Sequence, residues 1–237
     1  MAEGHVANGT NRLLSVLDKG AYQELAPKLE RVSLILRQKL YEPNKPFDYA
    51  YFPVNGVVSM LAHVDDGALV EVATVGNEGM IGLPIFLGAE LTPGTSFSQI
   101  PGDALRISAE HFRQAIAQDG PLTRLLHRYT QALMVQISQG TACNRAHSRE
   151  ERCGRWLLLC HDRVGENEFL LTQEFLSQML GVRRASVNAV ATTFQQAGFI
   201  EYTRGRMRIL DREGLESVSC GCYAVIRQEY DRMLESL

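Results

Sequence analysis

The sequence predicts an α+β protein in three successive parts: an antiparallel β-rich half, a long helix, and a C-terminal unit of short helices with a hairpin. Short apolar or alternating runs separated by turn residues fill residues 34–107. Apolar residues recur at steps of three and four after Pro121, and two short helical patterns joined by Gly181 precede a hairpin pattern. The expected boundaries of the three parts are 1–120, 121–145 and 146–237.

Composition is that of an ordinary globular chain. Of its 237 residues, 45% are hydrophobic and 22% are charged, which is enough for a sizeable core. No run reaches the roughly 18 apolar residues that a membrane span needs, and the first residues lack a secretory signal, so we expect a cytoplasmic protein. The five cysteines are odd in number and all lie in the second half, which indicates reduced thiols and not a disulfide framework.

Charge is distributed unevenly along the chain. The net charge is -3, but residues 143–212 carry 11 Lys and Arg against 8 Asp and Glu. A solvated basic surface would explain this excess, and so would a nucleic-acid partner. The excess therefore directs attention to the motifs inside this segment.

The first half contains helical patterns at its two ends. Residues 21–33 have a helical pattern, and another begins at Ser108. Between them, the spacing of short strands by Gly, Pro and Asn turns predicts a compact antiparallel sandwich or roll.

The long helix begins at Pro121, which suits a first helical position. One face carries a regular apolar stripe, formed by Leu122, Leu126, Tyr129, Leu133 and Ile137. Such a stripe packs either on a second copy of the helix or on the chain's own core, and we assign it to a dimer interface. A further helix starts near Ser148, where Glu151 has the capping-box spacing, and it ends at Gly165.

Two short helices follow. Thr172 is a plausible cap of the first, Gly181 supplies the tight turn, and the second is expected from about Arg183 to Ala197. The outer face of the second helix opens with groups that reach phosphate oxygens and base edges. These groups are Arg183, Arg184, Ser186 and Asn188.

A basic hairpin comes next. Residues 199–202 and 207–210 predict two strands around a tight "TRGR" turn, with Arg204 and Arg206 at the tip. Two helices followed by this hairpin form a winged helix-turn-helix, whose wing lies along the sugar-phosphate backbone. The expected DNA contacts are Thr172, Arg183, Arg184, Ser186, Asn188, Arg204 and Arg206.

The stretch from Leu171 to Leu210 resembles the DNA-binding domain of the Crp/Fnr transcription regulators, whose first-helix pattern is matched by residues 172–181. The resemblance implies a cyclic nucleotide-binding-like β-roll of the double-stranded β-helix type and a homodimer that reads an inverted repeat in double-stranded DNA and can contact RNA polymerase. Arg184 falls on the family's base-reading arginine, which would be bidentate to guanine. Ala185 and Ala189 depart from the family's usual residues, which leaves Asn188 as a candidate second base reader.

The sensor half departs further from the family. Cyclic-nucleotide members hold the ribose with a glutamate and the phosphate with an arginine, but here Leu83 and Pro84 follow Gly82, and Thr95 stands where the arginine belongs. Without a cation a buried phosphate would be unpaired, so we expect no cyclic-AMP binding. A neutral or apolar effector, or a filled core, is the remaining choice. The candidate pocket residues are Gly82, Leu83, Phe86, Thr95 and Ser96.

Other classes of function have less support. No cysteine precedes Cys143, which excludes the family's N-terminal iron–sulfur cluster. Cys220 and Cys222 could bind a soft metal with Cys160 or His161, giving a metal- or redox-sensing regulator, but two thiols are half a site and we assign no metal and no cofactor. No nucleophile motif or phosphate loop indicates an enzyme. A protein-binding winged helix is the other alternative.

Overall fold

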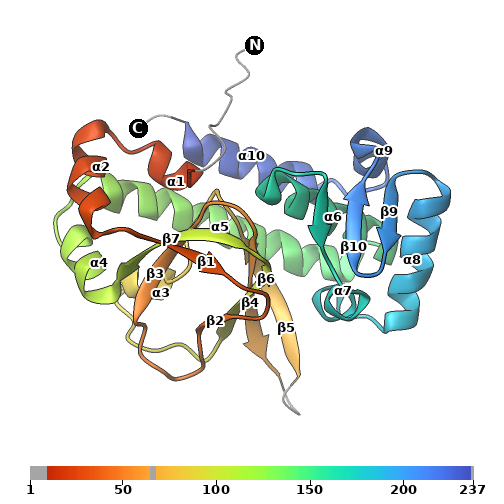
Figure 1. Ribbon diagram of the computed structural model, residues 1–237, viewed down its shortest axis with the longest axis horizontal. Coiled ribbons are helices and arrows are strands. Elements are labelled where there is room, and N and C mark those ends of the chain that lie inside the picture. The colour runs from red at the N-terminus through yellow and green to blue at the C-terminus, as the bar shows by residue number, and fades with distance from the viewer. Residues whose placement is uncertain (1–9, 65–67, 236–237) are drawn as a thin grey trace.

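The computed structural model describes residues 10–64 and 68–235 of the chain (Figure 1). The expected first part, 1–120, therefore begins before the described residues, and the expected last part, 146–237, ends after them. The described chain is a mixed α and β structure, as the sequence predicts. A β-rich half lies on one side of the long helix α5, and the C-terminal helices and hairpin lie at the end of that helix (Figure 1).

The β-rich half is a roll of two antiparallel sheets. One sheet has the order β1-β7-β3 and the other β2-β6-β4-β5. In sequence order the strands are β1 (Glu30–Leu34), β2 (Lys39–Tyr41), β3 (Tyr49–Pro53), β4 (Val57–His63), β5 (Leu69–Val75), β6 (Thr95–Ile100) and β7 (Gly102–Ser108). Short helices flank them: α1 (Arg12–Ser15), α2 (Lys19–Leu25), α3 (Leu83–Phe86) and α4 (Ala109–Ile116).

The helix expected over residues 21–33 is wrong in its second half. Helix α2 ends at Leu25, a 3-10 turn follows over Ala26–Lys28, and β1 starts at Glu30. Proline at the second position of that turn has no N–H and disfavours continuation of the helix. Residues 30–34 instead pair with β7, an interaction that local helical periodicity does not reveal.

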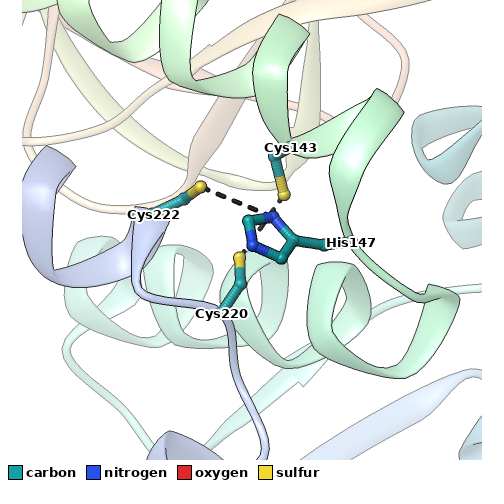
Figure 2. Close-up of side chains that lie close together, drawn as sticks. All are labelled: Cys143, His147, Cys220 and Cys222. Atoms are coloured by element: carbon teal, nitrogen blue, oxygen red, sulfur yellow. Dashed lines mark hydrogen bonds between the residues drawn. The ribbon is translucent and has the colours of Figure 1, made fainter.

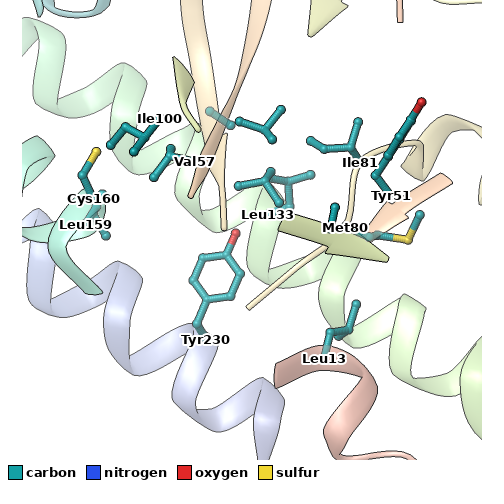
Figure 3. Packing of buried hydrophobic residues seen from close by; sticks show 14 of the residues in the cluster. Leu13, Tyr51, Val57, Met80, Ile81, Ile100, Leu133, Leu159, Cys160 and Tyr230 are labelled. Carbon is teal, nitrogen blue, oxygen red and sulfur yellow. The ribbon is translucent and has the colours of Figure 1, made fainter. Parts of the chain in front are cut away.

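The apolar stripe of α5 (Pro121–Ala146) packs inside its own chain. Leu122, Leu126, Tyr129 and Leu133 are buried, and the Tyr129 hydroxyl donates to the Met80 carbonyl at 2.9 Å. Ile137 is half-buried and lines a cavity. Figure 3 shows Leu133 among residues of the roll and of α10. The assignment of this stripe to a dimer interface is therefore corrected: the roll and α10 already cover it.

The last helix, α10 (Cys222–Leu234), returns to α5 instead of staying with the DNA-binding unit (Figure 1). Arg128 on α5 donates to the Arg232 carbonyl at 2.6 Å, and Arg12 pairs with Asp231 at 3.3 Å. The C-terminal helix therefore packs mainly on the long helix, and the Tyr223 hydroxyl also ties it to Asp162 of α6 (Arg149–Val164) at 2.9 Å.

A buried polar network joins the two halves. Arg163, on α6, pairs with Glu78 at 2.8 Å and donates to Gln136 of α5 at 2.9 Å and to Thr74 of β5. The Arg163 and Glu78 side chains are almost wholly buried. A buried charge that loses its partner costs several kcal/mol, about 3 to 5 in known cases, so this pair fixes α6 against the roll.

Candidate nucleic-acid interface and sensor

The two short helices form as the sequence predicts. They are α7 (Gln173–Leu180) and α8 (Arg184–Gln196). The Thr172 hydroxyl accepts a hydrogen bond from the Phe175 amide at 3.2 Å, and Gly181 has a φ of 61°. That left-handed backbone favours glycine because it has no Cβ. The side chain of Arg183, the N-cap of α8, makes no capping bond, and the Ser186 amide donates to the Arg183 carbonyl at 2.9 Å, so the amides of Arg184 and Ala185 are available to an anion such as phosphate.

The outer face of α8 carries exposed polar groups. Arg184 and Asn188 are exposed, and Gln173 of α7 connects them. The Arg184 Nε donates to the Gln173 Oε1 at 3.4 Å, and the Gln173 Nε2 donates to the Asn188 Oδ1 at 3.0 Å. Arg183 is exposed and Ser186 is half-buried. The candidate base readers therefore share one surface.

Sequence reasoning missed Gln173. The residue lies at the first position of α7, directly after the Thr172 cap, and this position faces the opening turn of α8. A polar side chain next to a predicted cap was the available signal. Its partner, however, is 11 residues further along the chain and depends on the angle between the two helices.

The wing is a two-residue hairpin. Strands β9 (Ile200–Thr203) and β10 (Arg206–Ile209) are joined by Arg204 and Gly205, whose φ angles are 51° and 79°. Two consecutive positive φ angles are typical of the turn that matches the strand twist. Arg204 is exposed, and within the described chain it makes no ion pair.

A third strand partly neutralises the wing. Glu168 of β8 (Glu168–Leu170) pairs with Arg206 at 3.1 Å and with Arg208 at 2.7 Å. Hydrogen bonds from Arg208 and Arg206 hold the pKa of Glu168 below its usual value. Such exposed pairs contribute little to stability, so a phosphate can compete for Arg206.

Backbone contacts fix the wing beside the start of α7. The Leu171 amide donates to the Gly205 carbonyl at 2.8 Å, and the Tyr202 hydroxyl donates to the Leu171 carbonyl at 2.9 Å. Thr172, an expected DNA contact, is exposed next to this junction, although its hydroxyl already caps α7. The seven expected DNA contacts thus lie on α7, α8 and the wing of one unit.

The five expected effector residues lie in a well-packed part of the roll. Leu83, Thr95 and Ser96 are buried, and Thr95 donates to the Tyr41 carbonyl at 3.0 Å. The Phe86 ring packs edge-on against His127 of α5, with ring centroids 4.9 Å apart. Gly82 has a φ of 101°, and a Cβ there would lie 3.2 Å from the Ala50 Cα. None of the five residues carries a charge, so none of them can balance a phosphate.

A separate cavity of about 200 Å³ lies between β5, α5, α6 and α7. Its lining includes Glu71, Gln136, Asn144, Arg155 and Trp156. Glu71 accepts hydrogen bonds from the Trp156 Nε1 at 2.9 Å and from Ser59 at 2.8 Å. Burial raises the pKa of Glu71 to about 7, against the opposing effect of these two bonds. The cavity is thus lined both by Glu71 of the roll and by Arg155 and Trp156 of α6, the first helix of the DNA-binding unit.

Comparisons with known proteins find two known domains in the chain. Residues 33–119 match the cyclic nucleotide-binding domain, and residues 151–218 match the Crp-like helix-turn-helix domain. No curated protein sequence matches the chain.

Many solved structures share the fold, and three of them illustrate the match. FixK2 from Bradyrhizobium japonicum has a TM-score of 0.69 and 16% identity, over 81% of this chain and 98% of that one. A CRP-family transcriptional regulator from Thermus thermophilus, TTHB099, has a TM-score of 0.66 and 16% identity, over 79% and 96%. The c-di-GMP responsive global regulator CLP of Xanthomonas campestris has a TM-score of 0.61 and 16% identity, over 81% and 99%.

The two domain matches, in this order and on this fold, define a transcription regulator with a helix-turn-helix DNA-binding domain. The chain belongs to the Crp/Fnr family. Members of this family are transcription regulators and not enzymes. In the described part of the chain, no helix is both long and apolar enough to cross a membrane.

Proposed function

We propose that the chain is a sequence-specific DNA-binding regulator that reads an inverted repeat as a homodimer. The observation that carries the proposal is the hydrogen-bonded row of Arg184, Gln173 and Asn188 beside the uncapped start of α8. A helix presented to the major groove by its N-terminal end needs polar groups and free amides at that end. Family resemblance adds RNA polymerase as a further partner.

The residues of this surface have different roles in the proposal. Arg184 reads a guanine through two hydrogen bonds, and Asn188 reads a second base. Gln173 holds both side chains in the free protein and releases them to the bases at small cost, since its bonds are exposed. The remaining contacts are made to the phosphate backbone by Thr172, Arg183, Ser186, Arg204 and Arg206.

The dimer uses the face of α5 that lies away from the roll. Exposed residues recur there at steps of three and four, and Met134 is 59% exposed. They are Arg124, His127, Gln131, Met134 and Ser138, of which His127 lies at the edge of this face and also packs against Phe86 of the roll. Two α5 helices that pair along this face present two copies of α8 to successive major grooves about 34 Å apart.

The effector is neither cyclic AMP nor cyclic GMP. The Gly82, Leu83, Phe86, Thr95 and Ser96 region contains no cation to balance a phosphate. An effector bound there is therefore neutral or apolar.

Selection of duplexes from a random pool tests the proposal. We expect an enriched inverted repeat for the wild-type chain, and loss of preference at one base pair per half-site for Arg184→Ala. A pool that shows no enrichment, with binding that is insensitive to salt, supports the protein-binding alternative instead.

A further inference from the structure

Four side chains that can bind a metal meet where the end of α5 faces the start of α10 (Figure 2). Cys143 lies in the last turn of α5, and His147 ends that helix four residues later. Cys220 and Cys222 stand on either side of Gly221, the N-cap of α10. One ligand atom from each of the four lies within 4.8 Å of those of the others. The three cysteines are buried, and His147 is half-buried.

The distances fit a tetrahedral ion. The sulfurs of Cys143 and Cys220 are 3.4 Å apart, and the Cys222 sulfur is 3.7 Å from the His147 Nδ1. A tetrahedral metal with metal–sulfur bonds of about 2.3 Å separates its sulfurs by about 3.8 Å. A disulfide requires about 2.05 Å, and all five cysteines are free. The four groups are therefore spaced as metal ligands and not as a bridge.

Simple apolar packing does not account for the cluster. Cys153 and Cys160 pack in the main core, whereas Cys143, Cys220 and Cys222 form a small cluster of their own. Apolar packing also gives no reason for an imidazole nitrogen to lie against a sulfur. Three thiols and one imidazole are instead a common ligand set of structural zinc sites.

The sequence suggested Cys160 or His161 as a third ligand, and the structure places neither of them in the cluster. Cys160 is enclosed in the main core, and the nitrogens of His161 are occupied by Arg212 at 2.7 Å and Asn167 at 2.8 Å. The partners of Cys220 and Cys222 come instead from α5, more than 70 residues earlier in the chain.

A buried cation completes the charge balance. Arg155 of α6 is 9% exposed, and its Nε has no acceptor among the described residues. The guanidinium of Arg155 lies within hydrogen-bonding reach of the Cys143 sulfur. A divalent ion with three thiolates and a neutral imidazole carries one net negative charge, which one guanidinium balances.

We propose that Cys143, His147, Cys220 and Cys222 form a tetrahedral site for a thiolate-binding divalent cation of the zinc class. Four protein ligands leave no open position, so the ion is structural. It ties the end of α5 to the start of α10, directly before Ser148 opens the DNA-binding unit. This site does not depend on the proposed DNA sequence specificity or on the effector.

Cobalt and zinc titration of the reduced, chelator-stripped full chain tests the site. We expect uptake of about one Co²⁺ per chain, with thiolate charge-transfer and tetrahedral ligand-field bands, and its displacement by Zn²⁺. Zinc raises the melting temperature because it binds the folded state. Cys222→Ser weakens binding roughly a hundredfold or more, and His147→Gln shifts the ligand-field bands while three thiolates remain.

Cys153→Ala is the matched control, because this buried cysteine lies outside the cluster, and it is expected to bind cobalt like the wild type. Absence of stoichiometric uptake by the wild-type chain overturns the proposal. So does uptake that is unchanged in Cys222→Ser. If Cys222→Ser does not fold, the half-buried His147 decides, since an unchanged cobalt spectrum in His147→Gln excludes this ligand set.

Discussion

The start of α8, where we propose DNA contacts, and the segment from Gly82 to Phe86, where we expect an effector, differ in chemistry. At α8, Arg184 is exposed, and its Nε donates to the Gln173 Oε1 at 3.4 Å. In the roll, Leu83 is buried and the Thr95 hydroxyl is committed to the Tyr41 carbonyl. The two segments belong to the same fold, but binding of a phosphate depends on an available cation. The start of α8 has such a cation in Arg184, whereas Leu83 and Thr95 provide none.

The roll and the DNA-binding unit are connected through the buried network around Arg163. Its partners come from β5, α5 and the turn that carries Glu78. The Arg163–Glu78 pair thus holds α6 of the DNA-binding unit against the roll. The proposed DNA contacts on α8 and the wing take no part in this network. Substitutions at Arg163, Met134 and Arg184 separate the attachment of the DNA-binding unit from dimer formation and from DNA contact.

Arg163→Met should cause the largest loss of stability. The substitution leaves the buried Glu78 carboxylate without its partner, so the free energy of unfolding should fall by about 3 to 5 kcal/mol in urea denaturation. The control is Arg227→Met, which removes an exposed pair with Asp231 at 3.7 Å and should change stability by less than about 0.5 kcal/mol. Equal effects of the two substitutions would show that the network does not anchor α6.

Met134→Glu should produce folded monomers. The residue is 59% exposed on the free face of α5, so a charge there opposes pairing without entering the core. We expect the dimer dissociation constant to rise roughly a hundredfold, about 2.7 kcal/mol, in sedimentation equilibrium. The neighbouring Leu133→Glu should unfold the chain instead, because Leu133 is buried. A Met134→Glu chain that remains dimeric places the seam elsewhere.

Arg184→Ala should weaken specific DNA binding by about 1 to 3 kcal/mol and relax preference at one base pair per half-site. Arg206→Ala is the comparison variant, since a wing arginine that contacts phosphate should lower affinity for all duplexes alike and reduce the salt dependence. The measurement is a salt titration on specific and random duplexes. The base-reading role is excluded if Arg184→Ala lowers both affinities by the same factor.

Glu71→Gln should remove a pH dependence of stability. Because the folded pKa is raised from its usual 4.5 to about 7, the folded state binds more protons in this window, and stability falls as pH rises through it. The variant should therefore match the wild type near pH 4.5 and exceed it at pH 8, by on the order of 1 kcal/mol. Melting curves at both pH values test this, and equal differences at the two would contradict it.

Cyclic AMP and cyclic GMP should have no effect. At millimolar concentration they should neither raise the melting temperature nor change DNA affinity, because a ligand shifts an equilibrium only through differential affinity. Calorimetric titration is the measurement. Saturable binding with a dissociation constant below about 100 micromolar would overturn the assignment of an uncharged pocket.

Local sequence patterns predicted the two short helices and the hairpin of the DNA-binding unit well. Thr172, Gly181 and the Arg204–Gly205 turn each act over a few residues, so their roles follow from the sequence alone. The pairing of Glu168 with Arg206 was not visible, because β8 joins the hairpin only after the helices between them have packed.

Long-range packing explains what the sequence could not predict. The stripe through Leu126 and Leu133 has the correct helical period, but its covering by the roll and α10 depends on where the last helix returns. The same return brings Cys220 to Cys143, so only half of that cluster was apparent from the sequence. The roles of the seven DNA contacts and of the effector residues stay predictions.

Footprinting of the selected duplex by hydroxyl radicals tests the central claim most directly. Two copies of α8 in successive major grooves should protect two backbone segments on one face of the duplex, centred about 10 base pairs apart. Arg184→Ala should lose this pattern on the selected sequence at concentrations where the wild type shows it. A single protected segment, or protection of the same kind on unrelated duplexes, would contradict the account of a dimer that reads an inverted repeat through α8.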